Sequence, residues 1–317
     1  MSEKLGIIHG GKFQDGLELY INTIKQTQYK KCELYTPTEM SAFVYKSTLP
    51  YEFRYGTAVV YNNEIHIMGS DLNATKHYKW NGSSWSYVST LPVSLTNGEA
   101  VVYNNEIHIF YNRSHYKWNG SSWTSVSTLP YDFYHGRAVV YNNEIHILSG
   151  TGTTFGSSNG KNHYKWNGNS WTSVSTLPYN LASGCAILYA NQIHILGAGS
   201  DSDYKKHYKW NGNSWTSVST LPYGFYEGSL VVYNNEIHIL GGSGSTSYVP
   251  NGEKHYKWNG SSWSSVSTLP YEFYDGRAVV YNNEIDILGG DAYGTDKSKN
   301  HYYYKKDEDG IYTAVLT

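Results

Sequence analysis

Positive charge, cysteine and long apolar segments are all in short supply in this sequence. The 317 residues include 24 Lys and Arg against 26 Asp and Glu, so the net charge is −2. This balance excludes a broad basic surface for nucleic acid or for an anionic membrane. Two cysteines, Cys32 and Cys185, are too few for a disulfide framework or a four-ligand zinc site. No apolar run approaches the roughly 18 residues that membrane insertion requires.

The N-terminus, Met1 to Gly6, lacks the apolar stretch of a secretory signal peptide. We therefore expect synthesis in the cytoplasm, with the mature protein either cytoplasmic or part of a virion. Four of the basic residues are arginine and the rest are lysine, whereas Asn, Ile and Tyr are abundant. This usage is typical of low-G+C coding and indicates a bacterial or phage source.

Aromatic residues are plentiful, with 33 Tyr and 10 Trp, and they recur at a regular spacing. The pentapeptide Tyr-Asn-Asn-Glu-Ile occurs five times, and five copies of His-Tyr-Lys-Trp-Asn-Gly follow the same spacing. Leu-Pro pairs recur every 38 to 48 residues, with the prolines at Pro50, Pro92, Pro130, Pro178, Pro222 and Pro270. A period near 45 without helical patterning predicts the blades of a propeller.

Each repeat predicts four strands. In the third repeat these strands are expected at 138–141, 144–148, 163–166 and 171–175. Asn142-Asn143 supplies the positive φ angles of a tight turn, and Asn167-Gly168 predicts a two-residue hairpin. Pro178 ends the fourth strand, because proline cannot extend a sheet ladder. The aromatic side chains of the third and fourth strands are expected to fill the wedge between blades.

An apolar strand followed by Gly-Gly and then by a spaced Tyr and Trp resembles the kelch repeat. The pairs Gly241-Gly242 and Gly289-Gly290 are intact, and Tyr256 and Trp263 follow the first of them. The other copies of the pair are altered, for example to Gly69-Ser70. The resemblance covers Tyr51 to Thr317. It implies an all-β propeller of four-stranded kelch-like blades, similar to proteins of phages and low-G+C bacteria.

The first 50 residues admit two interpretations. Residues 41–50 look like a fourth strand, with Phe43 in place of the usual Trp, although residues 311–316 already occupy that position in the last repeat. This surplus strand favours a degenerate seventh blade formed by residues 1–50. The alternative is a ring of six blades, built from 51–317, with residues 1–50 as a docking arm. Either interpretation gives one propeller domain.

The two rims of such a ring differ in sequence. The Asn-Asn and Asn-Gly turns are nearly identical on one rim, whereas the loops between second and third strands vary on the other, which is where binding sites are usual. The links between blades add aromatic and polar groups to the variable face. We predict that this face binds ligand through Tyr131, Phe133, Tyr134, His135, Tyr223, Phe225, Tyr226, Tyr271, Phe273 and Tyr274, or that half of these rings simply pack between blades.

Arg137, Arg277 and Glu99 follow the recurrent glycine at the start of inner strands, so they are expected at the mouth of the central channel. They either form a polar lining or bind a ligand carboxylate. The second strands carry a recurrent His, replaced by Asp286 in the last copy. Equivalent positions in different blades lie too far apart for one metal ion, so we predict hydrogen-bonded packing with third-strand histidines such as His77 and no metal.

No nucleophile–base or phosphate-binding motif stands out, so we expect no catalytic residues and no cofactor. The kelch resemblance makes three kinds of sugar-active enzyme worth testing against the sequence. A galactose-oxidase-like copper site and a sialidase-like arginine cluster lack their residues here, while a sialic-acid mutarotase stays open, with Arg137, Arg277 and Glu99 as its candidates. We predict a non-enzymatic propeller, foremost a phage tail, baseplate or decoration protein. The alternatives are a glycan-binding lectin and a cytosolic interaction scaffold. The expected partners are virion or cell-surface proteins, or surface glycans, with symmetric copies in an assembly.

Overall fold

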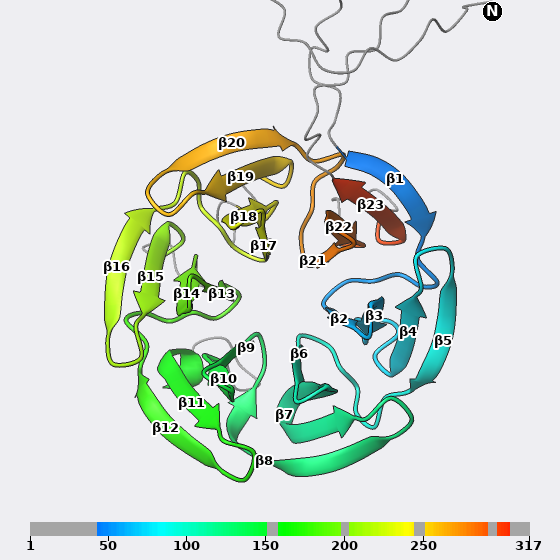
Figure 1. The fold of residues 1–317 in the computed structure, drawn as a ribbon, viewed down its shortest axis with the longest axis horizontal. Coiled ribbons are helices and arrows are strands. Elements are labelled where there is room, and N and C mark those ends of the chain that lie inside the picture. The colour runs from blue at the N-terminus through cyan, green and yellow to red at the C-terminus, as the bar shows by residue number, and fades with distance from the viewer. Residues whose placement is uncertain (1–42, 151–157, 198–202, 244–250, 291–296, 305–317) are drawn as a thin grey trace, which may run out of the picture.

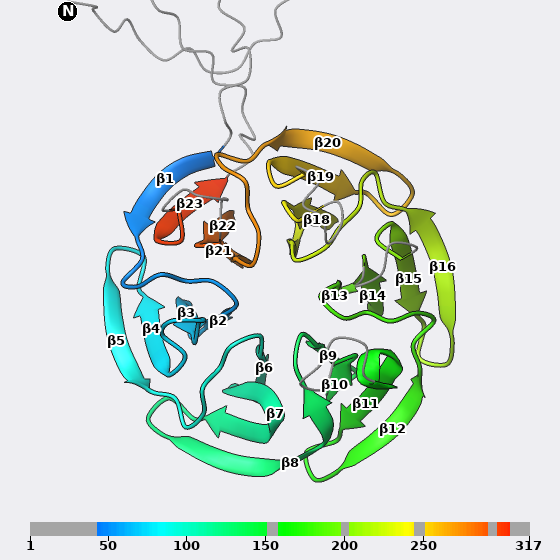
Figure 2. The ribbon, with the colours of Figure 1, turned by 180° about the vertical axis from the view of Figure 1, so that it is seen from behind.

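The computed structural model describes residues 43–150, 158–197, 203–243, 251–290 and 297–304. Six antiparallel sheets stand around a common axis like the blades of a propeller (Figures 1 and 2). The region around this axis, lined by the six inner strands, is called the channel below. The inner strand of each sheet contacts the inner strands of both neighbouring sheets, including the first and the last. The all-β propeller predicted from the repeat is therefore confirmed.

The blades follow one another in sequence, and each runs from the channel outward. Blade 1 contains β2 (Thr57–Tyr61), β3 (Glu64–Met68), β4 (Lys76–Trp80) and β5 (Trp85–Thr90). Blade 2 contains β6 (Glu99–Tyr103), β7 (Glu106–Trp118) and β8 (Trp123–Phe133). Blade 3 contains β9 (Arg137–Tyr141), β10 (Glu144–Leu148), β11 (Asn162–Trp166) and β12 (Trp171–Thr176), with the short 3-10 helix η1 (Ser158–Lys161) before β11.

The second half of the ring repeats this plan. Blade 4 contains β13 (Cys185–Tyr189), β14 (Gln192–Leu196), β15 (Lys206–Trp210) and β16 (Trp215–Thr220). Blade 5 contains β17 (Ser229–Tyr233), β18 (Glu236–Leu240), β19 (Lys254–Trp258) and β20 (Trp263–Thr268). Blade 6 contains β21 (Arg277–Tyr281), β22 (Glu284–Leu288) and β23 (Asn300–Tyr304). Among the described residues, no helix is long and apolar enough to cross a membrane.

The outer strand of blade 6 comes from the other end of the described chain. Strand β1 (Phe43–Thr48) pairs with β23, so the sheet order is β1-β23-β22-β21. Because β2 and β21 contact one another directly, the ring closes with six blades and no seventh stands between them. The favoured seventh blade was therefore wrong for residues 43–48. The alternative is correct in its six blades but not in building them from 51–317 alone, because β1 completes blade 6. The other strands expected within residues 1–42, and the one at 311–316, lie outside the described residues.

Two local predictions also need correction. Residues 167–170 form a four-residue connection between Trp166 and Trp171, not a two-residue hairpin, because the Asn167 side chain accepts the backbone N–H groups of Asn169 and Ser170. In blade 2, the outer strand β8 continues past Pro130, which is tolerated at the free edge of a sheet. The Asn142-Asn143 turn is as predicted, with φ angles of 50° and 58°.

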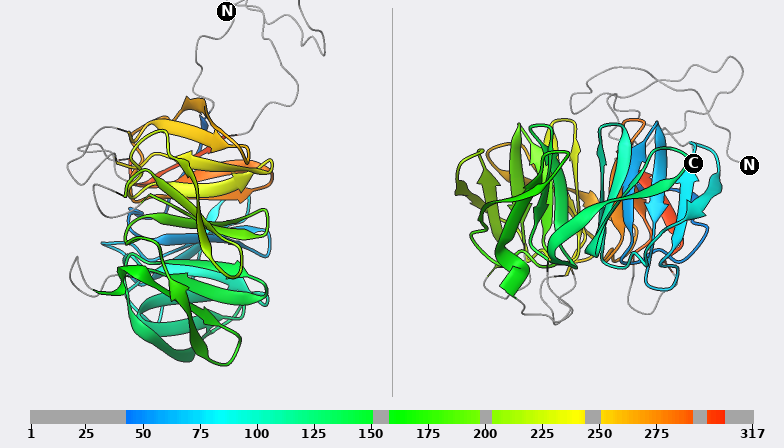
Figure 3. Two further views of the ribbon diagram at one scale, coloured as in Figure 1. Left: turned by 90° about the vertical axis from the view of Figure 1, so that its left-hand side faces the viewer. Right: turned by 90° about the horizontal axis from the view of Figure 1, so that it is seen from below.

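The core lies between blades, not within them. Buried clusters combine residues of adjacent sheets, as in the packing of Ile145 and Ile147 in blade 3 against Phe110 and Leu129 of blade 2. Trp166 is buried in the same cluster, with Tyr164 and Trp171 packed against it, as predicted. Seen from the side, the blades form a disc with two rims (Figure 3). One rim carries the short hairpin turns, and the other, the loop face, carries η1 and the links between blades.

Candidate functional site at the channel mouth

The links that enter the inner strands surround the axis on the loop face, and this end of the ring is called the channel mouth. A glycine precedes every inner strand, and at Gly136 an added Cβ would lie 2.3 Å from the ring of Phe133. Any side chain larger than that of glycine would force the link to shift. The residue before each glycine has a positive φ between 52° and 58°, and these six residues form an outer ring: Tyr55, Asn97, His135, Ser183, Glu227 and Asp275.

Backbone hydrogen bonds close the outer ring. The N–H of each member donates to the carbonyl of the member in the preceding blade, from Asn97 to Tyr55 at 2.8 Å through to Tyr55 to Asp275 at 2.9 Å. The six bonds form one uninterrupted cycle of 2.8 to 3.3 Å around the mouth. The scaffold of the mouth is thus fixed by main chain, which leaves the side chains of the ring free to differ.

An inner ring lies two residues further along each link, at the first residue of each inner strand. Its members are Thr57, Glu99, Arg137, Cys185, Ser229 and Arg277. The next four positions of these strands are nearly constant, reading Ala-Val-Val-Tyr in four of the six copies. Within an almost uniform repeat, the sequence therefore diverges at one small region of each blade, and the fold brings these regions together at the mouth.

The two arginines of the inner ring belong to blades 3 and 6, which face one another across the channel (Figure 1). Each donates to the carbonyl of its preceding glycine, Arg137 at 3.0 Å and Arg277 at 3.1 Å. Glu99 accepts Thr57 Oγ1 at 3.0 Å through Oε1, and its Oε2 lies 3.6 Å from Arg137 Nη1. Among the described residues, no carboxylate oxygen lies within 4.0 Å of the Arg277 guanidinium.

Burial lowers the pKa of Arg277, and repulsion from Arg137 adds to this effect against the attraction of Glu99. Arginine nevertheless keeps its proton in proteins, so the charge stays in place and is incompletely compensated. An incompletely paired guanidinium in a partly buried site favours an incoming anion with two acceptor oxygens. The inner ring is therefore suited to a carboxylate.

A row of polar side chains follows half of the outer ring. Ser183 Oγ lies 3.3 Å from His135 Nδ1. Burial raises the pKa of Tyr226, and the neighbouring Glu227 adds to this effect while Ser183 opposes it. Burial, with the charges of Arg137 and Arg277, lowers the pKa of His135 to about 4. Burial raises the pKa of Glu227, against the opposing effects of Tyr226 and Arg137. At neutral pH the imidazole is uncharged, while the carboxyl holds its proton more tightly than usual.

The predicted aromatic face is mostly interior. Tyr134 and His135 are partly exposed, and Tyr134 packs edge-on against Tyr111 with ring centroids 5.0 Å apart. Eight of the ten predicted residues are buried: Tyr131, Phe133, Tyr223, Phe225, Tyr226, Tyr271, Phe273 and Tyr274. Three of these tyrosines donate to loop carbonyls in the same way, for example Tyr223 to Gly241 at 2.8 Å. Their rings hold the links and loops in place, so they give no open surface for stacking on a sugar.

The recurrent histidines form a separate, buried structural layer between neighbouring blades. His146 Nδ1 lies 2.8 Å from His163 Nε2, whose Nδ1 lies 2.8 Å from Ser175 Oγ. The indole N–H of Trp215 in the next blade donates to the same hydroxyl at 3.1 Å. The predicted pairing of second- and third-strand histidines is confirmed. Within the described ranges, no group of three His, Cys, Asp or Glu is placed to hold a metal.

Blade 6 gives this layer the composition of a hydrolase triad. His301 lies between Asp286, at 2.7 Å, and Ser47, at 2.9 Å. The hydroxyl of Ser47 also accepts the indole N–H of Trp85 at 3.0 Å, and the imidazole is fully buried between blades. Since the other blades repeat the arrangement with His in place of Asp286, its role is to join blades and not to attack a substrate.

The sequence matches no protein-family model and shows no significant similarity to a curated protein. Its fold is common, because 459 chains of solved structures match it. The structure of YjhT superposes with a TM-score of 0.69 at 14% sequence identity, covering 85% of this chain and 99% of YjhT. At this identity the similarity shows the fold alone. The kelch resemblance of the repeat stays a prediction.

Sequence reasoning placed Arg137, Arg277, Glu99 and His135 at this face but overlooked several neighbours at the mouth. Tyr55, Asn97 and Ser183 complete the outer ring, and Thr57, Cys185 and Ser229 complete the inner ring. Cys185 is a buried free thiol that donates to the Gly228 carbonyl at 3.2 Å. Burial raises the pKa of that thiol, which keeps it protonated and unreactive. A column-by-column comparison of the six repeats would have found all of them, because they are the columns that vary next to an invariant glycine.

Proposed function

We propose that the protein is a non-enzymatic binding propeller whose channel mouth holds the carboxylate of an acidic sugar, either free or at the end of a surface glycan. The observation that carries the proposal is the pair of opposed arginines, of which Arg277 has no carboxylate within ion-pair distance in the described chain. The outer ring adds hydroxyl, amide, imidazole and carboxyl groups, which suit the hydroxyls of a sugar.

Isothermal titration calorimetry with sialic acid, glucuronic acid and their methyl esters tests this proposal. We expect the acids to bind and the esters to bind at least tenfold more weakly, because esterification removes the charge that the arginines meet. Arg277→Ala and Arg137→Ala should each lower affinity for the acid about tenfold to a hundredfold. Arg113→Ala is the matched control, since Arg113 is exposed and bonds to the Pro130 carbonyl.

Equal affinity for acid and ester, or unchanged affinity in Arg277→Ala, would refute the carboxylate assignment. The absence of binding by every sugar tested, with folded protein, would remove the acidic-sugar proposal altogether. Binding that survives both arginine substitutions but is lost on Tyr134→Ala would instead favour recognition by the outer part of the loop face.

A second candidate is catalysis of anomeric exchange in the same acidic sugar. His135 and Glu227 favour it, because their pKa values are moved in opposite directions at one mouth. Opening of the sugar ring requires a base for the anomeric hydroxyl proton and an acid for the ring oxygen, and these two groups offer both. Saturation-transfer NMR at pH 7 distinguishes the candidates: an accelerated exchange that Glu227→Gln abolishes would establish the enzyme.

We also propose that the protein is displayed on a virion, as a tail, baseplate or decoration component. Support comes from the sequence, with its phage-like repeats and low arginine content. Mass spectrometry of purified virions from the source organism tests this part independently. Detection at a copy number that matches a symmetric assembly is expected, and absence from virions would leave a cytoplasmic binding protein.

A further inference from the structure

Blade 6 differs from the other blades in where its lysine lies. In blades 1, 2, 3 and 5, a third-strand lysine bonds to the first glutamate of the second strand, as Lys165 does to Glu144 at 2.9 Å. The fourth strand carries valine at its centre, and the second strand carries the recurrent His. In blade 6, Tyr303 replaces the lysine, Asp286 replaces the His, and Lys46 of β1 replaces the valine.

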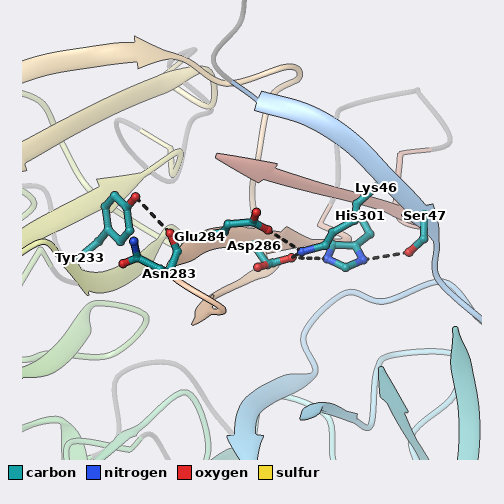
Figure 4. A network of polar contacts seen from close by, with 7 residues as sticks. All are labelled: Lys46, Ser47, Tyr233, Asn283, Glu284, Asp286 and His301. Carbon is teal, nitrogen blue, oxygen red and sulfur yellow. Dashed lines mark hydrogen bonds and ion pairs between the residues drawn. The ribbon is translucent and has the colours of Figure 1, made fainter. Parts of the chain in front are cut away.

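The relocated lysine bridges two carboxylates that no other lysine or arginine among the described residues approaches. Lys46 Nζ lies 2.7 Å from Asp286 Oδ1 and 2.9 Å from Glu284 Oε2 (Figure 4). The Asp286 side chain is fully buried, and 15% of the Lys46 side chain is exposed. The rings of Tyr281 and Tyr303 lie 5.5 Å and 5.1 Å from the same nitrogen. Lysine, carboxylates and aromatic faces therefore fit one another as a set.

We propose that Lys46, Glu284 and Asp286 form an address that directs the N-terminal strand to blade 6 and so specifies closure of the ring. In the described chain, Asp286 is the one acidic residue at the recurrent His position. Any other blade would set Lys46 against His, where it would meet no buried carboxylate. A shift of β1 by one residue would turn Lys46 to the opposite face of the sheet. The three residues thus fix both the partner strand and its register.

The charge also explains why closure requires β1 and not a generic edge strand. Burial alone would lower the pKa of Lys46, but the hydrogen bonds and charges of Asp286 and Glu284 outweigh it, so the pKa is raised and the ammonium is retained. Without β1, Asp286 would keep its bond from His301 but lose its cation. A buried carboxylate without a cation is destabilising, so the loss of Lys46 raises the free energy of the open ring relative to the closed one.

A double-mutant cycle in the full-length protein tests the address, with Lys46→Val, Asp286→His and both together. The measurement is hydrogen exchange of the amides in residues 43–48 and 300–304, compared with β12 and β16. In K46V these amides should exchange on the order of a hundredfold faster while β12 and β16 stay protected. The double variant, which restores the valine and histidine of the other blades, should return most of the lost protection.

Lys165→Val is the matched control, because Lys165 is 37% exposed and pairs with a glutamate on the same sheet. It should leave exchange in β1 unchanged. Equal effects of K46V and K165V, or a double variant whose loss is the sum of the two single losses, would overturn the address. If K46V does not fold, recovery of folded protein in the double variant supports the proposal, and failure of both refutes it.

Discussion

Two regions of the molecule differ in how far the six repeats agree: the layer between blades is nearly constant, and the channel mouth varies. Between blades, five of the six seams repeat the bond from a tryptophan N–H to a serine, and the sixth has Phe43 in place of the tryptophan. At the mouth, each blade presents a different pair of side chains above the same cycle of backbone bonds. The comparison shows that the repeated residues join the blades, while the residues that differ between repeats gather at the mouth, where we propose that a ligand binds.

Low pH should cause the largest loss of stability, because it protonates the buried histidines between the blades. Burial lowers the pKa of second-strand histidines such as His66 to about 4, and of their third-strand partners such as His77 to about 3. Their ordinary value is 6.5, so the unfolded chain binds more protons below that pH, and stability is lost as pH falls from 6.5 toward 3. Because this pair is repeated around the ring, we expect the free energy of unfolding to fall by several kcal/mol between pH 6.5 and 5. Urea denaturation at a series of pH values measures the decline.

This account would be contradicted if the loss of stability at low pH did not depend on the buried histidines. His146→Gln with His163→Gln, in one blade, should reduce the slope of unfolding free energy against pH relative to the wild type. An unchanged slope would show that other groups govern acid unfolding.

Gly136→Ala is expected to have the next largest effect, because it disturbs the shared scaffold of the mouth. The added Cβ would lie 2.3 Å from the Phe133 ring, so the link must shift at a cost of about 2–3 kcal/mol. Urea denaturation measures the loss, with Ser121→Ala in an exposed hairpin as control. A loss no larger than in that control would show that the link adapts freely and that the outer ring is not rigid.

Trp171→Phe should give one of the five tryptophan seams the chemistry of the seam between blades 5 and 6, where Phe43 replaces the tryptophan. The change removes the indole N–H that bonds to Ser127 Oγ at 2.9 Å, and we expect about 1–2 kcal/mol of destabilisation. Thermal unfolding with an otherwise native fold by circular dichroism measures it. A loss above about 4 kcal/mol would mean that the tryptophan acts mainly through packing.

Arg277→Ser should change stability least, by no more than about 1 kcal/mol, since blade 5 already has serine at this position and the charge of Arg277 is repelled by Arg137. Ligand binding should nevertheless be lost in the same variant. Thermal unfolding and calorimetry on one preparation separate the two properties. A large loss of stability would show that Arg277 stabilises the ring, as the residues between the blades do, and would contradict a separate binding role for the mouth.

Much of the fold was predictable because the same pattern of strands and turns occurs in six copies of the repeat. The period, the Asn-Asn turns and the prolines give strand number and order. The alternation of Glu144 to Leu148 predicted a strand but not its burial, because Ile145 to Leu148 are all buried. The candidate site was predictable only in part. Arg137 and Arg277 stand out because arginine is rare here, whereas Asn97 and Ser183 look like ordinary loop residues until the links are superposed. The buried Tyr131 and Phe133 misled, since a link rich in aromatics reads equally as a binding face or as packing.

The sequence by itself determined the strand pattern, the blade type and the two unequal rims, because these follow from local spacing and turn chemistry. Only the tertiary structure decided that six blades close the ring, that Phe43–Thr48 completes the last of them, and that Arg137 faces Arg277 across the channel. These facts depend on contacts between residues more than a hundred positions apart, such as Lys46 with Asp286, which no local pattern encodes. Closure requires the pairing of β1 with β23 and the contact of β2 with β21, and both join residues that meet only once the chain has folded.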